Sequence, residues 1–251
     1  MENISDGQEC LFDMELLKKR RARATFLGFE DFIQKLLVDD LRVRLNELDK
    51  KFDHPLLIGP FLSNWSASLL NQTFEESSDL DVLQLKKNHD LIIHCLCLHW
   101  SNDPLGKLIQ MKRSLKPGGL LMGYLFGEGT LRELRASFNK AEIELEGSLS
   151  LRVVPMVEVK SMGNLLGRAG FEKTVSDLIT HKVHYSELRS LFSDLRRMGE
   201  TNALRKQKKT FLRRSTYEKM ITNYQEEFLD FDGKFITTFN IICFTGWKKQ
   251  N

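Results

Sequence analysis

The sequence has no apolar run that approaches the roughly 18 residues needed by a membrane-spanning helix. Its first ten residues, MENISDGQEC, are polar and lack the basic-then-apolar order of a signal peptide. Cysteines are few, and three of the four (Cys10, Cys95, Cys97 and Cys243) fall in apolar segments that we expect to be strands. That pattern is typical of buried thiols in a reducing compartment rather than of a disulfide framework. We therefore expect a cytoplasmic protein without a membrane span.

An excess of charge of one sign is also missing. The chain has 37 basic and 34 acidic side chains in 251 residues, and the difference of +3 is too small to indicate a nucleic-acid partner by itself. Basic residues do cluster over 18–23 and 205–214. The simpler interpretation is that they form solvated helix faces, and the alternative is a docking surface for an acidic partner.

Several catalytic and metal-binding motifs are absent. The chain contains no P-loop and no Gly-x-Ser-x-Gly nucleophile elbow. Cys95 and Cys97 lie between His94 and His99, but neighbouring strand residues point to opposite faces, so only the two cysteines could converge. A structural zinc site needs four ligands, and no second pair at ligand spacing exists. We expect no metal site.

The most informative stretch that is present runs from His89 to Gly127. Residues 91–98 form a nearly continuous apolar run, as in a strand that is covered on both faces of a parallel sheet. Asp103 is suited to cap a helix and Pro104 to open it, and apolar residues then recur at helical spacing until a turn at 116–119. Residues 120–126 supply a second strand. This βαβ order predicts an α/β fold whose ligands bind at the carboxyl ends of parallel strands.

The remaining segments continue the alternation of helices and strands. Before the βαβ unit we expect helices over 11–25, 27–50 and 63–76 and strands over 55–59 and 80–85. After it we expect helices from 130, over 162–170, over 186–198 and from 215, with strands over 175–185 and 235–247. Thr130 and Glu133 have the spacing of a capping box for the first of these helices.

This order of elements resembles a class I S-adenosylmethionine-dependent methyltransferase. The match is carried by six blocks: LFDMELLKKRRARA near the start, LCLHWSNDP, SLKPGGLLMGYLFGEGTLRELR, MGNLLGRAGF, LRRMGETNAL and the terminal FTGW. Together they are similar to the malonyl-carrier-protein O-methyltransferase (BioC) group, and to the branch that contains mitochondrial complex I assembly factor 5 and its bacterial relatives. The resemblance covers Leu11 to Trp247, and LHW, MGETNAL and FTGW are its most specific parts.

The resemblance implies a single Rossmann-like domain over residues 1–251, with a mostly parallel sheet and an antiparallel last strand. Residues 1–50 would form N-terminal helices, residues 55–185 and 235–247 the sheet core, and residues 186–230 a helical cap. About 30 residues separate Gly59 from Asp90, roughly the length of one βαβ unit, where the family fits two crossovers. We therefore expect the sheet to be shortened by a strand or a helix.

The resemblance also implies S-adenosylmethionine as the cofactor. The residues that it places beside the cofactor are Gly59, Phe61, Asp81, Cys95, Leu96 and His99. The turn after the first strand, GPFLSNW, departs from the family's pattern, because it keeps one glycine and follows Leu57 where an aspartate is usual. This degenerate loop predicts weakened cofactor binding. Asp79 or Asp81 could replace the family's ribose-binding carboxylate, or could simply belong to a turn.

In the family, the helical cap helps to enclose the substrate. The residues that the resemblance places nearest the substrate are Trp100, Tyr185, Asp194, Arg196, Glu200 and Asn202. The cap residues could equally be surface positions on capping helices. His99 and Trp100 match the family's HW, but Trp100 could also close the core and His99 could cap backbone groups. The sequence identifies no catalytic residue.

Two functions are consistent with the resemblance. The first is methyl transfer from S-adenosylmethionine to a malonyl-acyl-carrier-protein-type substrate in biotin synthesis, a reaction in which proximity and orientation supply most of the acceleration. The second is a binding or assembly protein, related to respiratory complex I assembly factors, with lost or weakened cofactor binding. The expected partner is acyl carrier protein in the first case and a respiratory-complex subunit in the second.

Overall fold

A computed structural model describes residues 10–250 except 49, 70–73, 80–82, 84, 86–87 and 208–210. In chain order the elements are α1 (Met14–Phe26), α2 (Phe32–Glu47), β1 (Pro55–Ile58), α3 (Leu62–Ser68), β2 (Glu75–Ser77), β3 (His89–His94), the 3-10 helix η1 (Leu98–Trp100), α4 (Pro104–Ser114), β4 (Leu115–Phe126), α5 (Arg132–Glu146), α6 (Val159–Arg168), β5 (Glu172–Tyr185), α7 (Leu188–Arg197), α8 (Arg214–Glu227) and β6 (Phe235–Trp247). Among the described helices, none combines the length and the apolar character required to cross a membrane.

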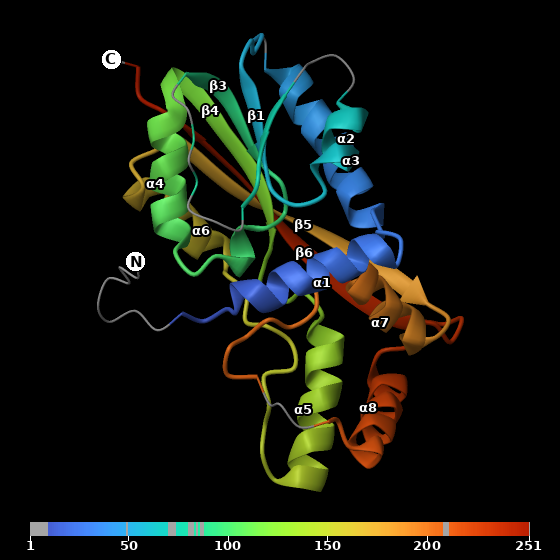
Figure 1. The fold of residues 1–251 in the computed structure, drawn as a ribbon. Helices are drawn as coiled ribbons and strands as arrows, with labels where there is room; N and C mark the ends of the chain where they lie inside the picture. Colours follow the sequence, from blue (N-terminus) through green and yellow to red (C-terminus); the bar gives the residue numbers. More distant parts are fainter. Residues whose placement is uncertain are drawn as a thin grey trace.

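The described strands form one sheet in the order β2-β1-β3-β4-β6-β5 (Figure 1). β1 pairs in parallel with β2 and β3, and β3 pairs in parallel with β4. β6 runs antiparallel to both of its neighbours, β4 and β5. A mostly parallel sheet with an antiparallel last strand is what the family resemblance implied, so the α/β fold class is confirmed.

The interval between β1 and β3 holds one helix, α3, and one strand, β2, in the part of the chain that the structure describes. The helix expected over 63–76 is too long, because α3 ends at Ser68 and residues 75–77 form β2 instead. β2 pairs with Leu56–Ile58 of β1, and this tertiary pairing overrides the local helical pattern. The strand expected over 80–85 falls largely outside the described residues. The six strands of the described sheet agree with the shortening that the length of this interval predicted.

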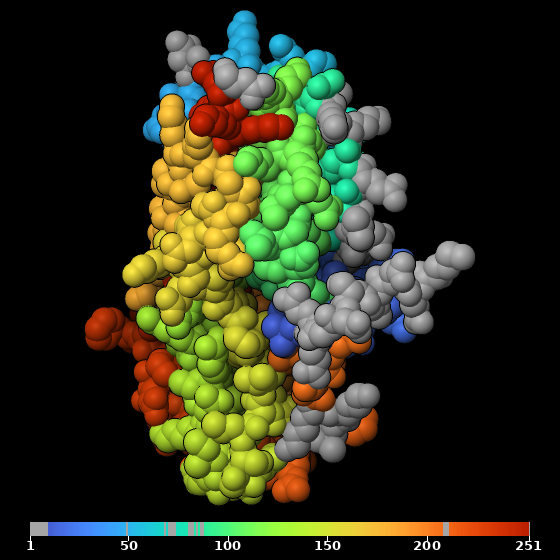
Figure 2. All heavy atoms as spheres, turned by 90° about the vertical axis from the view of Figure 1, so that its left-hand side faces the viewer, coloured from blue at the N-terminus to red at the C-terminus, as the bar shows by residue number. Residues whose placement is uncertain are grey.

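Both faces of the sheet are covered by helices, because successive strand residues point to opposite faces. Leu91 of β3 packs in one apolar cluster with Leu37 of α2. The next residue, Ile92, packs in the opposite cluster with Leu108 of α4 and Leu166 of α6. The space-filling view shows α4 beside the segment that runs from α6 into β5, forming a continuous wall on that side (Figure 2).

A layer of helices lies beyond the carboxyl ends of the parallel strands. α5 packs along α8 there, and α1 crosses the edge of the sheet in contact with α7 (Figure 1). The start of α1 is fixed by Asp13, whose side chain accepts the N–H of Leu16 at 2.9 Å and whose own N–H donates to Ala203 at 2.8 Å. The expected cap of residues 186–230 contains α7 and α8, and α5 joins them.

One expected helix cap is confirmed and another is wrong. Asp103 accepts the N–H of Gly106 at 2.8 Å at the start of α4, as the sequence predicted. Thr130 and Glu133 form no capping box, because both side chains bond to β6 instead. The buried Glu133 carboxylate accepts the hydroxyl of Thr238 at 2.5 Å and its backbone N–H at 3.1 Å, which anchors α5 to the sheet.

Candidate functional site

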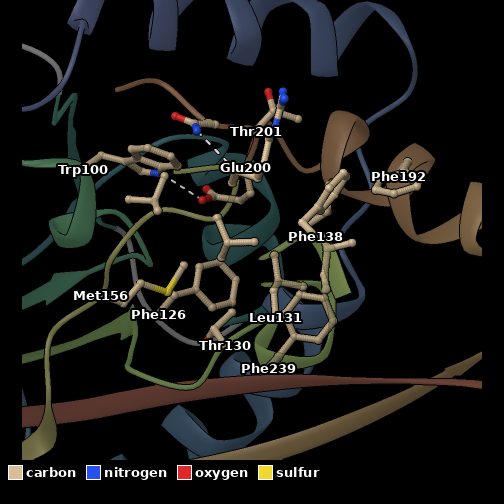
Figure 3. Close-up of a pocket in the computed structure, with 16 residues that line it drawn as sticks. Trp100, Phe126, Thr130, Leu131, Phe138, Met156, Phe192, Glu200, Thr201 and Phe239 are labelled. Atoms are coloured by element: carbon tan, nitrogen blue, oxygen red, sulfur yellow. Dashed lines mark hydrogen bonds between the residues drawn. The ribbon is translucent and has the colours of Figure 1, made fainter. Parts of the chain in front are cut away.

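A cavity of about 220 Å³ lies between the carboxyl ends of β3 and β4 and the layer of cap helices (Figure 3). Its apolar walls are Trp100, Phe126, Leu131, Leu134, Phe138, Val153, Val154, Met156, Phe192, Leu195 and Phe239. Its remaining lining residues are Thr130, Arg152, Glu200, Thr201 and Asn202. Ligand pockets commonly combine such apolar walls with a few polar groups that fix orientation. This cavity, called the cap cavity below, is the candidate binding site.

The carboxylate of Glu200 is held at the wall of the cap cavity by two side chains from η1. The indole Nε1 of Trp100 donates to Oε2 of Glu200 at 2.7 Å, as the dashed line in Figure 3 marks. Nε2 of His99 lies 3.0 Å from the same oxygen. His99 therefore contacts a side chain rather than capping backbone groups, and the largely buried Trp100 both closes the core and orients Glu200.

The loop after α7 carries Glu200 and Asn202 into the cap cavity. Gly199 allows this turn because its φ of +76° suits glycine, and a Cβ there would lie 3.3 Å from Cγ of Arg21. The Asn202 amide donates to the carbonyl of Leu151 at 2.6 Å and to that of Arg152 at 3.3 Å. Asn202 thus ties the segment around Arg152 to the loop after α7 and closes this side of the cavity.

Arg152 is a charged cavity residue whose charge is already compensated. Its Nε donates to Oε1 of Glu142 at 2.8 Å, and its guanidinium lies 5.9 Å from the ring centroid of Phe138. Glu142 is fully buried and also accepts the backbone N–H of Ser150 at 2.6 Å. This pair fixes Arg152 against the end of α5 and leaves Glu200 as the acidic group of the cavity wall.

Three of the six expected substrate residues lie elsewhere. Trp100, Glu200 and Asn202 line the cap cavity, but Tyr185, Asp194 and Arg196 do not. α7 buries its apolar stripe at helical spacing, so Arg196 is turned to solvent. Tyr185 ends β5 in the core, where burial and the neighbouring Asp194 raise the pKa of its phenol.

The turn after β1 contacts the protein's own backbone closely. A Cβ on Gly59 would lie 2.8 Å from the carbonyl oxygen of Cys95 and 3.3 Å from Sγ of Cys97. Phe61 has a φ of +53°, and its ring stacks on Phe29 with centroids 3.9 Å apart. Trp65 is fully buried in the core. The single glycine of this turn therefore serves the contact between β1 and the end of β3.

The residues that follow β3 are buried. Leu96 has a φ of +50° and is 5% exposed. Burial raises the pKa of the Cys95 and Cys97 thiols well above the ordinary value and lowers the pKa of His94 to about 3. Sγ of Cys97 lies 3.6 Å from Nδ1 of His94. Among the described residues, no group of three or more His, Cys, Asp or Glu side chains could hold a metal ion.

A buried ion pair occupies the edge of the sheet beside these residues. Asp79 lies just beyond β2, and its Oδ1 is 2.8 Å from Nη1 of Arg21 in α1. Nζ of Lys107 in α4 donates to the backbone carbonyl of Asp79. Burial alone would raise the pKa of the Asp79 carboxyl, but Arg21 and Lys107 lower it overall. Asp81, the expected cofactor residue, lies outside the described residues.

Comparison with known proteins finds relatives of two kinds, although no family model matches the chain. Over 175 residues it is 37% identical to arginine-hydroxylase NDUFAF5, mitochondrial, of Danio rerio, which covers 69% of this chain and 54% of the relative. It is 33% identical over 136 residues to a malonyl-[acyl-carrier protein] O-methyltransferase of Coxiella burnetii, which covers 54% of this chain and 45% of the relative. The chain thus spans about half the length of the curated relatives it matches.

A solved structure shares the fold. A Bacillus halodurans C-125 protein assigned as a methyltransferase superposes with a TM-score of 0.53 and 12% identity, over 84% of this chain and 100% of that one. Both kinds of relative and the sheet order agree with the resemblance seen in the sequence. The chain belongs to the class I S-adenosylmethionine-dependent methyltransferase family. Within this family it is related to the BioC group and to the complex I assembly factor 5 branch.

The family's cofactor would lie at the carboxyl ends of β1, β2 and β3. In this methyltransferase-family chain, the described residues at that edge contact one another, because Cys95 and Cys97 lie against Gly59 and Arg21 pairs with Asp79. Of the other expected cofactor residues, His99 bonds to Glu200 on the cavity side instead.

Sequence reasoning missed Arg21 and Arg152. Arg21 belongs to the basic cluster over 18–23, and nothing in its spacing points to Asp79, which lies 58 positions later. Arg152 is the single charged residue in the apolar stretch LSLRVVPMV, and such isolation was a usable signal for a buried or site-facing side chain.

Proposed function

We propose that the chain is a partner-binding member of the methyltransferase family that holds a cationic side chain of a protein in the cap cavity. The observation that carries this proposal is the carboxylate of Glu200, fixed by Trp100 and His99 at the wall of a cavity with aromatic sides. The role corresponds to the assembly function that the sequence offered as an alternative, with a respiratory-complex subunit as the partner.

The charge balance of the cavity favours a cation. Arg152 is paired with Glu142 at 2.8 Å, whereas no lysine or arginine in the described part of the chain forms an ion pair with Glu200. Aromatic faces attract cations, and a carboxylate can accept two parallel hydrogen bonds from a guanidinium group. The apolar walls would contact the alkyl stem of the same side chain.

The names of the relatives support an arginine side chain. The proteins of Danio rerio and Homo sapiens, 37% and 38% identical to the matched parts of this chain, are named arginine-hydroxylases. An arginine side chain combines an apolar stem with a planar cation, which is the combination that the cap cavity matches. For this chain, what we propose is that the cap cavity recognises an arginine side chain of the partner.

Isothermal titration with a short peptide that has a central arginine tests this function. The comparison peptide carries citrulline, which keeps the shape of arginine without its charge. Because a hydrogen bond to a charged group contributes about 1.5–3 kcal/mol, we expect the arginine peptide to bind at least about tenfold more tightly. Glu200→Gln should abolish this preference, and Glu187→Gln, at an exposed position on the same cap, should preserve it. Equal affinity for the two peptides would contradict the proposal.

Methyl transfer to a malonyl-acyl-carrier-protein-type substrate in biotin synthesis is the second candidate function. It is favoured by the Coxiella burnetii relative and by the basic residues around 205–214, which follow cavity residue Asn202 and would suit an acidic carrier protein. Incubation with S-adenosylmethionine and malonyl-acyl carrier protein, followed by mass spectrometry, distinguishes the two. Appearance of the methyl ester would replace the first proposal. The cytoplasmic location expected from the sequence stays a prediction for both.

A further inference from the structure

We propose that helix α1 is the permanent occupant of the crevice in which this family holds its cofactor, with the guanidinium of Arg21 taking the cofactor's place against Asp79. The inference concerns the crevice and not the cap cavity, so it stands or fails independently of the proposed function.

Asp79 occupies a position that binds ligands in other α/β folds. In nucleotide-binding α/β folds, an acidic residue at the end of the second strand binds the ribose hydroxyls. Asp79 follows the end of β2 by two residues, and β2 lies directly beside β1. It therefore stands where such a carboxylate would bind a ligand, yet its side chain is only 2% exposed.

The partner of Asp79 comes from the chain itself. Arg21 reaches it from α1 with an Nη1–Oδ1 distance of 2.8 Å, and the Arg21 side chain is only 7% exposed. A charge that is removed from water in this way must be compensated, and each member of the pair compensates the other. A ligand that required Asp79 would have to displace Arg21 and leave a buried cation without its partner.

Other contacts hold α1 in this position. Leu17 and Ala24, on the same face of the helix, are fully buried, and the ring of Phe12 packs edge-on against Trp100 at 5.2 Å. A Cβ on Gly199 would meet both Cγ and Cα of Arg21. α1 therefore packs between the crevice and the loop that carries Glu200. It fills the crevice and supports the loop.

Thermal unfolding with and without S-adenosylhomocysteine tests the inference on the full chain. The probe at about 1 mM would measurably stabilise any site with a Kd near 10 µM. We expect no shift in the midpoint of the unmodified chain. Because breaking a buried ion pair is strongly destabilising, Arg21→Met should lower the midpoint by about 10 °C, whereas Lys19→Met on the exposed face of α1 should change it by less than about 2 °C.

A double variant keeps the test decisive if Arg21→Met does not fold. Replacing both members of a buried pair by apolar residues of similar volume is often neutral, so Arg21→Met with Asp79→Leu should recover most of the lost midpoint. Two results would overturn the inference. One is a rise in the midpoint of the unmodified chain with S-adenosylhomocysteine. The other is an unchanged midpoint in Arg21→Met, or no recovery in the double variant.

Discussion

Trp100 and Glu200 lie 100 positions apart in the sequence and are joined by a 2.7 Å hydrogen bond from the indole to the carboxylate. This bond connects the end of the β3 segment to the end of α7, so it joins the sheet to its helical cap. Because His99 reaches the same carboxylate oxygen, the HW dipeptide and the glutamate of MGETNAL act as one unit. Two of the three most specific sequence blocks of the family resemblance, LHW and MGETNAL, thus meet at the wall of the cap cavity.

The first prediction concerns the stability of this contact. Glu200→Ala should lower the free energy of unfolding by about 1–3 kcal/mol, because it leaves the buried indole N–H of Trp100 without an acceptor. Glu200→Gln should cost less than half as much, since its amide oxygen can still accept one hydrogen bond. Urea unfolding measures both, with Glu187→Ala as the exposed control. Equal losses for the alanine and glutamine variants would show that the hydrogen bond is not the cause.

Much of the fold could be predicted from local sequence, because the signals that define it are local. The apolar run over 91–98, the cap at Asp103 and the existence of the last strand all depend on neighbouring residues or on simple periodicity, whereas the antiparallel direction of that strand was implied by the family resemblance. Thr130 and Glu133 show the limit of such signals. Their spacing suits a capping box, but β6 offers both side chains partners more than 100 positions away. Tertiary contacts of this kind leave no trace in a local pattern.

The candidate site could be predicted only in part. The resemblance named Trp100, Glu200 and Asn202, which line the cap cavity, but it also named Arg196, which the apolar spacing of α7 turns to solvent. The sequence could not predict that a side chain of α1 takes the place of a ligand beside Asp79. That prediction would require knowing where α1 lies across the edge of the sheet. The degenerate loop after β1 indicates that cofactor binding is lost or weakened, but it does not show which residues occupy the crevice.

A second prediction follows from the burial of His94. Its pKa is lowered to about 3 from the ordinary 6.5 because burial disfavours the charged imidazole. Between these values the unfolded chain binds a proton that the folded chain does not, so stability falls as the pH falls through this window. We expect His94 to contribute a loss of up to about 1.4 kcal/mol per pH unit below pH 6.5. Urea titrations from about pH 7 to 5 should show a shallower slope for His94→Asn. An identical slope would contradict the assignment to His94.

A third prediction concerns thiol reactivity. The pKa values of Cys95 and Cys97 are raised well above 9.0 by burial, and burial raises that of Cys243 to about 12. Only the thiolate reacts, so native protein at about pH 8 should be labelled by a maleimide at Cys10 alone. Labelling in denaturant should reach all four thiols. Peptide mapping identifies the site, and a Cys10→Ser variant should remain unlabelled in its native state.

The last prediction compares two glycines with opposite surroundings. A Cβ on Gly123 of β4 would lie 2.4 Å from Cζ of Phe244 and 2.9 Å from Cβ of His94, and both neighbours are fully buried. Gly123→Ala should therefore destabilise the fold by about 1–3 kcal/mol through overpacking. Gly167 lies in α6, where a Cβ would meet nothing within 4 Å, so Gly167→Ala should stabilise by about 0.5–1 kcal/mol. Urea unfolding of the two variants should shift the midpoints in opposite directions. A neutral Gly123→Ala would mean that the packing between β4 and β6 is looser than these contacts require.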